Sequence, residues 1–443
     1  MKNANPRKCS VAVCAILLGA GVVWAEDWPQ WRGPNRDAKV TGFVAPKTWP
    51  KELTKKWTVK VGDGVATPAL VGDKLYVFSR EGNDEIIRCL NAGTGEKIWE
   101  DKSPAPGVRG PDSGYPGPRC SPTVAEGKVV TLGVGGTLSC FDAATGKKLW
   151  RNEDFKGEVP QFHTASSPVV VDGLCIAQVG SADDGGVFAF DMATGKKKWG
   201  WTENGPAYAS PALMTVDGAK LVIAETRAKM VALNVADGKL AWQTPFSTRY
   251  NAASPIVDGQ TLICAGQGKG ATAYHFEKKG DGFVAKELWK NSEKSVMYNT
   301  PVVKDGMLYG ITDRNDFFCI NAQSGKTAWS VASAKSGAPA GGPPPAGGSP
   351  PAGGQPKGKG GGRGGMGGMR GPLQGAGSIV DAGSVLVALI PSSQLVVFEP
   401  SDKAFTEIAR IKVASSPTYA YPVLVDNRLF VKDQDSVTLY TVQ

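Results

Sequence analysis

A nine-residue motif recurs five times along this chain of 443 residues and constrains its fold more than any other feature. In each copy an Asp or Asn stands eight positions before a Trp, and a Gly follows the Asp or Asn by four positions. The copies are NAGTGEKIW (91–99), DAATGKKLW (142–150), DMATGKKKW (191–199), NVADGKLAW (234–242) and NAQSGKTAW (321–329). The acidic or amide side chain can hydrogen-bond the backbone two residues on, and the Gly supplies the positive φ of a tight turn. The Trp suits a half-buried strand, so the motif predicts a repeated hairpin and hence a repeat protein.

A second element precedes each hairpin motif: Ser or Thr, then Pro, then apolar residues on both sides of a polar turn. This alternation is typical of two strands joined by a turn, and Pro is tolerated at the first strand position. The copies start at Thr67, Ser121, Ser167, Ser210, Ser254 and Thr300, with divergent copies at Gly377 and Tyr421. Each unit spans about 43 to 46 residues and encodes four strands, which is the size of a propeller blade.

These eight starts predict an all-β, eight-bladed propeller, with seven blades as the alternative. Lys55 to Val61 reads as an outer strand without a blade of its own, and the C-terminal VTLYTVQ ends a blade that lacks its outer strand. We therefore expect the N- and C-terminal strands to pair and close the ring, which removes exposed sheet edges. The predicted outer-strand positions are Trp57, Trp99, Trp150, Trp199, Trp242, Trp289 and Trp329, with Ile408 as the eighth.

Composition divides the chain into four segments. Residues 1–25 resemble a secretory signal, with a basic start, an apolar run and a small-residue cleavage site. Residues 26–54 form an N-terminal extension that contains WPQWRG, and residues 55–443 form the propeller. Within the propeller, residues 333–377 are rich in Gly, Pro and basic residues, so we expect a disordered insertion. The chain is thus expected to be exported to the periplasm or the medium as a soluble monomer without a transmembrane segment.

The net charge of +9 does not indicate a nucleic-acid partner. The signal contributes +3 and the Gly/Pro-rich insertion +5, which leaves about +1 on the folded body. A nucleic-acid interface should instead appear as a basic face on the domain itself.

The cysteines point to a core role. Cys89, Cys140 and Cys319 occupy one repeat position, where other repeats have Ala, as expected of small buried sites.

Candidate binding residues lie just before the Ser/Thr-Pro starts, where loops of a propeller reach the mouth of the central channel. Arg, Tyr, Asn and His side chains that converge there could bind an acidic or aromatic ligand; alternatively they form hydrogen bonds between blades. The candidates are Arg119, His163, Tyr208, Arg249, Asn251, Tyr298 and Asn299, with Tyr250, Tyr419 and Tyr421 nearby. Arg119 and Arg249 are the first choices for contact with an anion.

The sequence predicts neither a catalytic residue nor a metal site. His163 lies near Ser166 and Ser167, but these serines belong to the repeat start and no G-x-S-x-G turn is present. With only His163 and His275 available, a histidine-based metal site is not expected.

The combination of S-P-x-V-x-D-G-x-L-Y-V with A-x-D-x-x-T-G-K-x-L-W resembles the PQQ-like repeat. Quinoprotein alcohol dehydrogenases and the BamB family of outer-membrane assembly proteins share this repeat. The resemblance implies one of two functions. The first is a BamB-like, non-enzymatic scaffold without a cofactor, which binds envelope proteins or other envelope components. The alternative is a dehydrogenase that depends on PQQ and calcium, or a non-catalytic relative that binds PQQ.

Overall fold

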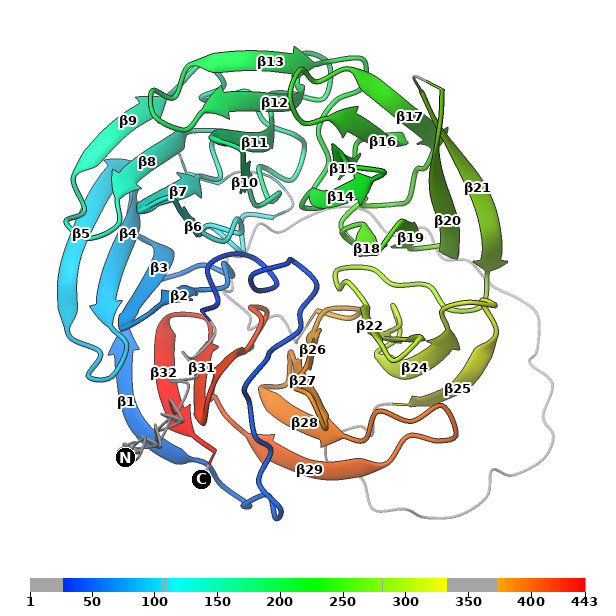
Figure 1. Cartoon of the computed structure of the whole chain (residues 1–443). Helices are drawn as coiled ribbons and strands as arrows, with labels where there is room; N and C mark the ends of the chain where they lie inside the picture. Colours follow the sequence, from blue (N-terminus) through cyan, green and yellow to red (C-terminus); the bar gives the residue numbers. More distant parts are fainter. Residues whose placement is uncertain are drawn as a thin grey trace, which may run out of the picture.

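The chain folds into a closed ring of eight blades around a central channel (Figure 1). The computed structural model describes residues 27–105, 107–108, 110, 112–280, 282–332 and 373–442. The predicted signal and residues 333–372 of the predicted insertion lie outside this range. Within it, the structure is all-β, and no helix is long and apolar enough to cross a membrane.

Each blade is a four-stranded antiparallel sheet, and in the first seven the strands run outward from the channel in chain order. The first four blades are β2 (Ala69–Val71) to β5 (Lys97–Pro104), β6 (Thr123–Ala125) to β9 (Lys148–Asn152), β10 (Val169–Val171) to β13 (Lys197–Trp201), and β14 (Ala212–Val216) to β17 (Leu240–Pro245). Their middle strands are β3 (Lys74–Glu81), β4 (Asp84–Asn91), β7 (Lys128–Leu132), β8 (Leu138–Asp142), β11 (Leu174–Val179), β12 (Gly186–Asp191), β15 (Ala219–Glu225) and β16 (Lys229–Asn234).

The next three blades repeat this order. They are β18 (Ile256–Asp258) to β21 (Gly282–Asn291), β22 (Val302–Lys304) to β25 (Thr327–Ala332), and β26 (Ser378–Asp381) to β29 (Glu407–Lys412). Their middle strands are β19 (Thr261–Gly266), β20 (Gly270–Lys279), β23 (Met307–Ile311), β24 (Asp316–Asn321), β27 (Leu386–Ile390) and β28 (Gln394–Phe398).

The eighth blade confirms the predicted closure of the ring. Its inner strands are β30 (Val423–Val425), β31 (Arg428–Lys432) and β32 (Ser436–Thr441), and its outer strand is β1 (Thr54–Lys60) from the other end of the chain. Trp57 pairs with Leu439 across the β1–β32 ladder. The prediction of eight blades is therefore correct.

The recurring nonapeptide joins each blade to the next. In the third blade, Asp191 accepts hydrogen bonds from the backbone of Ala193 and Thr194, and Gly195 adopts a φ of +71°. Trp150, on the outer strand of the second blade, lies directly on Gly195 and donates its indole N–H to the carbonyl of Met192 at 3.1 Å. The Gly is thus required twice, for its positive φ and because a Cβ would lie 2.6 Å from the Trp150 ring. Equivalent contacts place Trp57 on Gly95, Trp99 on Gly146, Trp199 on Gly238 and Trp289 on Gly325.

The Cys/Ala position is a small buried site, as predicted, and it lies directly across the strand pair from these tryptophans. Cys89, Cys140 and Cys319 face Trp99, Trp150 and Trp329, and Ala occupies the same position in the third to fifth blades. The six cysteines of the described residues are free and buried.

One predicted outer-strand position is wrong. In the seventh blade Ala409, not Ile408, occupies the Trp position, because Ala409 pairs with Val397 immediately before the same bulge that follows Cys89 in the first blade. Ile408 points outward and is 41% exposed. This blade lacks the Asp/Asn-to-Gly turn, so the eight-residue spacing that fixes the register elsewhere could not be counted.

A chain of hydroxyl groups links the starts of the inner strands. The backbone N–H of Thr67 donates to the Ser121 hydroxyl, and the N–H of Ser121 donates to the Ser167 hydroxyl, at 3.0 and 2.9 Å. The same bond continues through Ser210 and Ser254 to Thr300, and the N–H of Tyr421 donates to Thr67. Gly377 and Tyr421, in the two divergent repeats, lack a Ser or Thr hydroxyl, so the chain of bonds is interrupted between the sixth and eighth blades.

The N-terminal extension fills this interruption. Residues 28–37, here called the plug, cross the centre of the ring as the dark blue segment of Figure 1. Arg32 is 2% exposed and donates to the carbonyls of Thr300 and Pro301 and to the hydroxyl of Tyr421, at 2.8 to 2.9 Å. On the other side of the channel, Arg36 donates to the carbonyls of Ser167 and Pro168 at 3.0 Å.

The backbone is strained in the plug and at Ala38, the residue that follows it. Arg32, Arg36 and Ala38 all have φ near +60°, a conformation that costs roughly 1 to 3 kcal/mol for a residue with a side chain. Such strain persists only where the surroundings enforce it. The hydrogen bonds of the two arginines, together with the backbone bonds of Trp28 to Leu70 and of Pro29 to Val124, supply that restraint.

Candidate functional site

A cavity of about 410 Å³ lies in the channel between the plug and one face of the ring. This volume is within the usual range of small-molecule sites, roughly 300 to 1,000 Å³. Trp31 of the plug belongs to its lining. The plug forms hydrogen bonds with the inner strands at the Ser/Thr-Pro starts and at the residues that follow them. The cavity is lined by the starts and by the residues that precede them. The plug therefore closes one end of the cavity, and we call Trp31 its floor.

One repeat position supplies much of the lining. The residue two places before each repeat start points into the cavity in seven blades: Val65, Arg119, Ala165, Tyr208, Ala252, Tyr298 and Tyr419. The even-numbered blades contribute the large side chains at this position and the odd-numbered blades the small ones. Large and small side chains therefore alternate around the wall.

Loops add further aromatic rings to this wall. Phe162 meets Tyr208 and Tyr250 edge-on at centroid distances of 5.8 and 5.7 Å, and Tyr250 lies 5.1 Å from Tyr298. Tyr115 meets Tyr419 edge-on at 5.8 Å. Such contacts between neighbouring rings hold the aromatic wall in a defined arrangement.

A compact charged cluster sits in the wall beside the aromatic rings. Asp112 accepts from Arg119 at 2.8 Å and contacts Nδ1 of His163 at 3.0 Å, all through one oxygen, Oδ2. Arg119 also donates to the carbonyls of Tyr115 and Phe162. The other carboxylate oxygen, Oδ1 of Asp112, is buried and finds no hydrogen-bond partner among the described residues.

Two tyrosine hydroxyls of the wall have raised pKa values. Burial raises the pKa of Tyr208, and burial with the neighbouring Tyr250 hydroxyl raises that of Tyr298. The hydroxyl of Tyr208 accepts from the backbone N–H of Phe162 at 3.3 Å, and that of Tyr419 accepts from Leu373 at 3.4 Å. Both hydroxyls can still donate a hydrogen bond, because in the described part of the chain each one only accepts.

The structure brings some of the sequence candidates together and separates others. Arg119, Tyr208 and Tyr298 line the cavity, and His163 stands behind the wall against Asp112. Arg249 is exposed outside the lining, with its guanidinium 5.2 Å from the Tyr250 ring centroid.

Two candidates, Asn251 and Asn299, have a structural role. Asn251 is buried and donates to the carbonyls of Thr226 and Arg227, and Asn299 is buried and donates to those of Ile311 and Gly375. Both side chains hold loops in place through backbone carbonyls. The sequence analysis included them because it took polar residues just before the repeat starts, whereas the repeat positions that line the cavity are the start itself and the residue two places before it.

Sequence reasoning did not find Asp112, Tyr115, Phe162 or the floor residue Trp31 as site residues. Asp112 and Tyr115 lie on the long connection between β5 and β6, outside any repeat position. The end of the predicted insertion also belongs here, because Leu373, Ala376 and Gly377 line the cavity.

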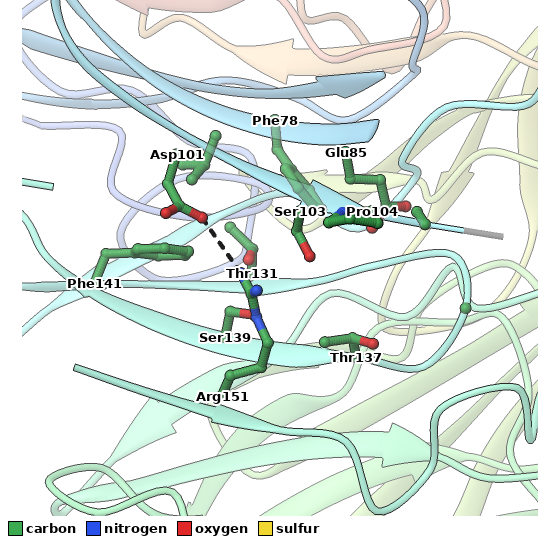
Figure 2. Close-up of a pocket in the computed structure, with 13 residues that line it drawn as sticks. Phe78, Glu85, Asp101, Ser103, Pro104, Thr131, Thr137, Ser139, Phe141 and Arg151 are labelled. Atoms are coloured by element: carbon green, nitrogen blue, oxygen red, sulfur yellow. Dashed lines mark hydrogen bonds and ion pairs between the residues drawn. The ribbon is translucent and has the colours of Figure 1, made fainter. Parts of the chain in front are cut away.

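A second, much smaller pocket lies between the first two blades, and Figure 2 shows its lining. Asp101 of β5 pairs with Arg151 of β9 at 3.3 Å across it, and Glu85 accepts from the backbone N–H of Val134. Burial raises the pKa of Glu85, opposed by that hydrogen bond and by Arg80 and Arg151. At about 20 Å³ this pocket holds a water molecule at most, so its polar groups serve the contact between blades.

Comparison with known proteins places the chain in a family. The profile of the outer membrane protein assembly factor BamB matches residues 46–181 and 83–331. The chain belongs to the BamB family. It is 28% identical over 302 residues to BamB of Burkholderia pseudomallei, a match that covers 64% of this chain and 71% of that protein.

Solved structures share the fold. BamB from Moraxella catarrhalis superimposes with a TM-score of 0.59 at 14% identity, covering 88% of this chain and 99% of that one. The quinohemoprotein alcohol dehydrogenase of Comamonas testosteroni gives 0.60 at 15% identity, covering 94% and 80%. In sequence, that dehydrogenase is 29% identical over 168 residues, which is 34% of this chain but only 22% of the enzyme.

Proposed function

We propose that this protein is an exported, non-enzymatic propeller that binds envelope proteins, in the manner implied by the name of its BamB relatives, outer membrane protein assembly factor. Its place of action would be the periplasmic side of the envelope. The proposal is supported by the family and by the exposed side chains of the outer strands.

The observation that carries the proposal is an apolar pair on neighbouring outer strands. Ile98 of β5 and Leu149 of β9 precede the motif Trp in adjacent blades and are 45% and 41% exposed. The outer strand of a blade also has one unpaired edge, to which an extended segment of a partner can add. Apolar side chains beside an open strand edge suit a protein partner, since burial contributes about 25 cal/mol per Å² of apolar surface.

A genetic complementation experiment tests this role. The gene would be deleted in its native host, and the amount of folded outer-membrane protein measured from heat-modifiable mobility in gels. We expect a deficit that the wild-type gene corrects and that an Ile98→Lys/Leu149→Lys variant, secreted at equal level, does not. Lys55→Glu/Lys56→Glu, at exposed positions of β1, is the matched surface control. No deficit on deletion, or full correction by the apolar-pair variant, would refute the proposal.

The alternative, a dehydrogenase dependent on PQQ and calcium, fits the cavity poorly. Calcium takes six to eight oxygen ligands, several of them carboxylates. The lining offers one carboxylate, Asp112, which already binds Arg119 and His163, and the described residues contain no group of three His, Cys, Asp or Glu side chains placed to hold a metal. Titration with PQQ and calcium, followed by a dye-linked alcohol oxidation assay, tests this alternative; turnover would overturn the non-enzymatic proposal.

A further inference from the structure

We infer that the central cavity is a binding site for a neutral saccharide. This inference goes beyond the proposed protein-binding role, because it concerns the channel and not the outer strands. It rests on the aromatic wall, on the charge of the cluster beside it and on one unpartnered oxygen.

The wall has the two kinds of surface that a sugar ring needs. A pyranose presents an apolar C–H face, which packs on aromatic rings, and a rim of hydroxyl groups, which exchange hydrogen bonds. Trp31, Tyr208, Tyr298 and Tyr419 supply rings on the floor and on three blades of the wall. The hydroxyls of Tyr208 and Tyr419 can bind the hydroxyl groups of the sugar, since each can donate a hydrogen bond while it accepts one from a backbone N–H.

The charges of the cavity argue against an ionic ligand. Arg119 is compensated by Asp112 at 2.8 Å and by two backbone carbonyls, so an anion would have to displace existing partners. A cation would be attracted to the aromatic faces, but Arg32 beneath the floor and Arg119 in the wall oppose it, with Asp112 as the single carboxylate of the lining. A neutral ligand neither has to displace the partners of Arg119 nor is repelled by the two arginines.

Asp112 gives the site a specific acceptor. It is a lining residue and is 9% exposed; its Oδ2 is fully engaged, whereas its Oδ1 finds no hydrogen-bond partner among the described residues. A buried carboxylate oxygen without a hydrogen-bond partner destabilises the folded state. A sugar hydroxyl that donated to this oxygen would remove that cost.

A calorimetric titration of the protein lacking residues 1–25 tests the inference. The probes are maltotriose, cellotriose, mannotriose and the trimer of N-acetylglucosamine, with galacturonate, choline and the peptide GGPPPAGGSPPAGG as the anionic, cationic and proline-rich arms. We expect at least one neutral trisaccharide to bind, and to bind more tightly than the three other arms. Failure of all four trisaccharides at millimolar concentration, or tighter binding of any other arm, would overturn the inference.

Variants then locate the site. Tyr298→Ala removes a ring that is 38% exposed and carries little of the fold, and should weaken binding about tenfold. Tyr208→Phe keeps the ring and removes the donor, and should weaken binding about threefold. Tyr440→Phe is the matched control, because its half-buried hydroxyl donates to the carbonyl of Val413 outside the cavity. Equal effects of Tyr208→Phe and Tyr440→Phe would place the ligand elsewhere. The Ile98→Lys/Leu149→Lys variant should bind saccharide normally, so the two proposals fail separately.

Discussion

Two glycines of the third blade allow the backbone requirement for glycine to be measured separately from the packing requirement. Gly173 and Gly195 have the same backbone conformation, with φ of +72° and +71°. A Cβ on Gly173 would meet nothing within 4 Å, whereas a Cβ on Gly195 would lie 2.6 Å from the ring of Trp150. Replacement of each by Ala therefore imposes the same backbone cost but a different packing cost.

The magnitudes follow from these two terms. Gly173→Ala should lower the free energy of unfolding by about 1 to 2 kcal/mol, the cost of a left-handed conformation for a residue with a Cβ. Gly195→Ala should lose this amount and a further 1 to 3 kcal/mol, because Trp150 must move off the turn and give up its hydrogen bond to Met192.

Urea unfolding followed by tryptophan fluorescence measures both values in one series. The double variant Gly195→Ala/Trp150→Phe provides a third point, since the smaller ring relieves the clash. Equal losses for Gly173→Ala and Gly195→Ala would refute the reasoning, because the Trp150 contact would then contribute nothing beyond backbone conformation.

Three further predictions concern buried groups. Burial raises the pKa of Glu225 well above 4.5, and neither of its oxygens has a partner among the described residues. The folded state thus holds this proton more tightly than the unfolded state, so stability falls as pH rises above about 4.5; Glu225→Gln should gain about 1 to 3 kcal/mol at pH 8 and little at pH 4, by urea unfolding at each pH. Arg32→Met should lower stability by about 1 to 3 kcal/mol, because the buried carbonyls of Thr300 and Pro301 lose their donor, and should expose the plug to limited proteolysis, whereas Lys51→Met, exposed in the same extension, should do neither. Burial raises the pKa of all six core thiols, to about 12 for Cys89, so a thiol reagent at pH 8 should label them only after denaturation; rapid labelling of native protein would contradict their burial.

The sequence predicts the ring well because its determinants are local and repeated. The spacing from Asp142 to Trp150 sets a turn, a bulge and the cross-strand partner Cys140 within one hairpin. Where that spacing is lost, at Ile408 and Ala409, the prediction slips by one residue. The number of blades is unaffected, because it follows from the repeat starts and not from the register of a single strand.

The cavity is less predictable because part of its lining lies outside the repeated positions. Tyr208, Tyr298 and Arg119 share one phase of the repeat, and a search restricted to that phase would have separated them from Asn251 and Asn299. The floor could not be found in this way. The acceptors of Arg32 lie 268 and 389 residues away along the chain, and no local pattern specifies contacts of that separation.

Those separations have a consequence for the order of folding. Each blade can form from neighbours in sequence, but the plug needs carbonyls of the sixth blade and a hydroxyl of the eighth, and β1 needs β32. Contacts between residues so far apart in sequence form slowly, because the entropy of closing a long loop is lost before the contact contributes any favourable free energy. The plug, although it lies near the start of the sequence, is thus among the last segments to reach its native position. The cavity, whose floor they form, exists only in molecules whose final blade is already built, so occupancy of the cavity would report completion of the whole ring.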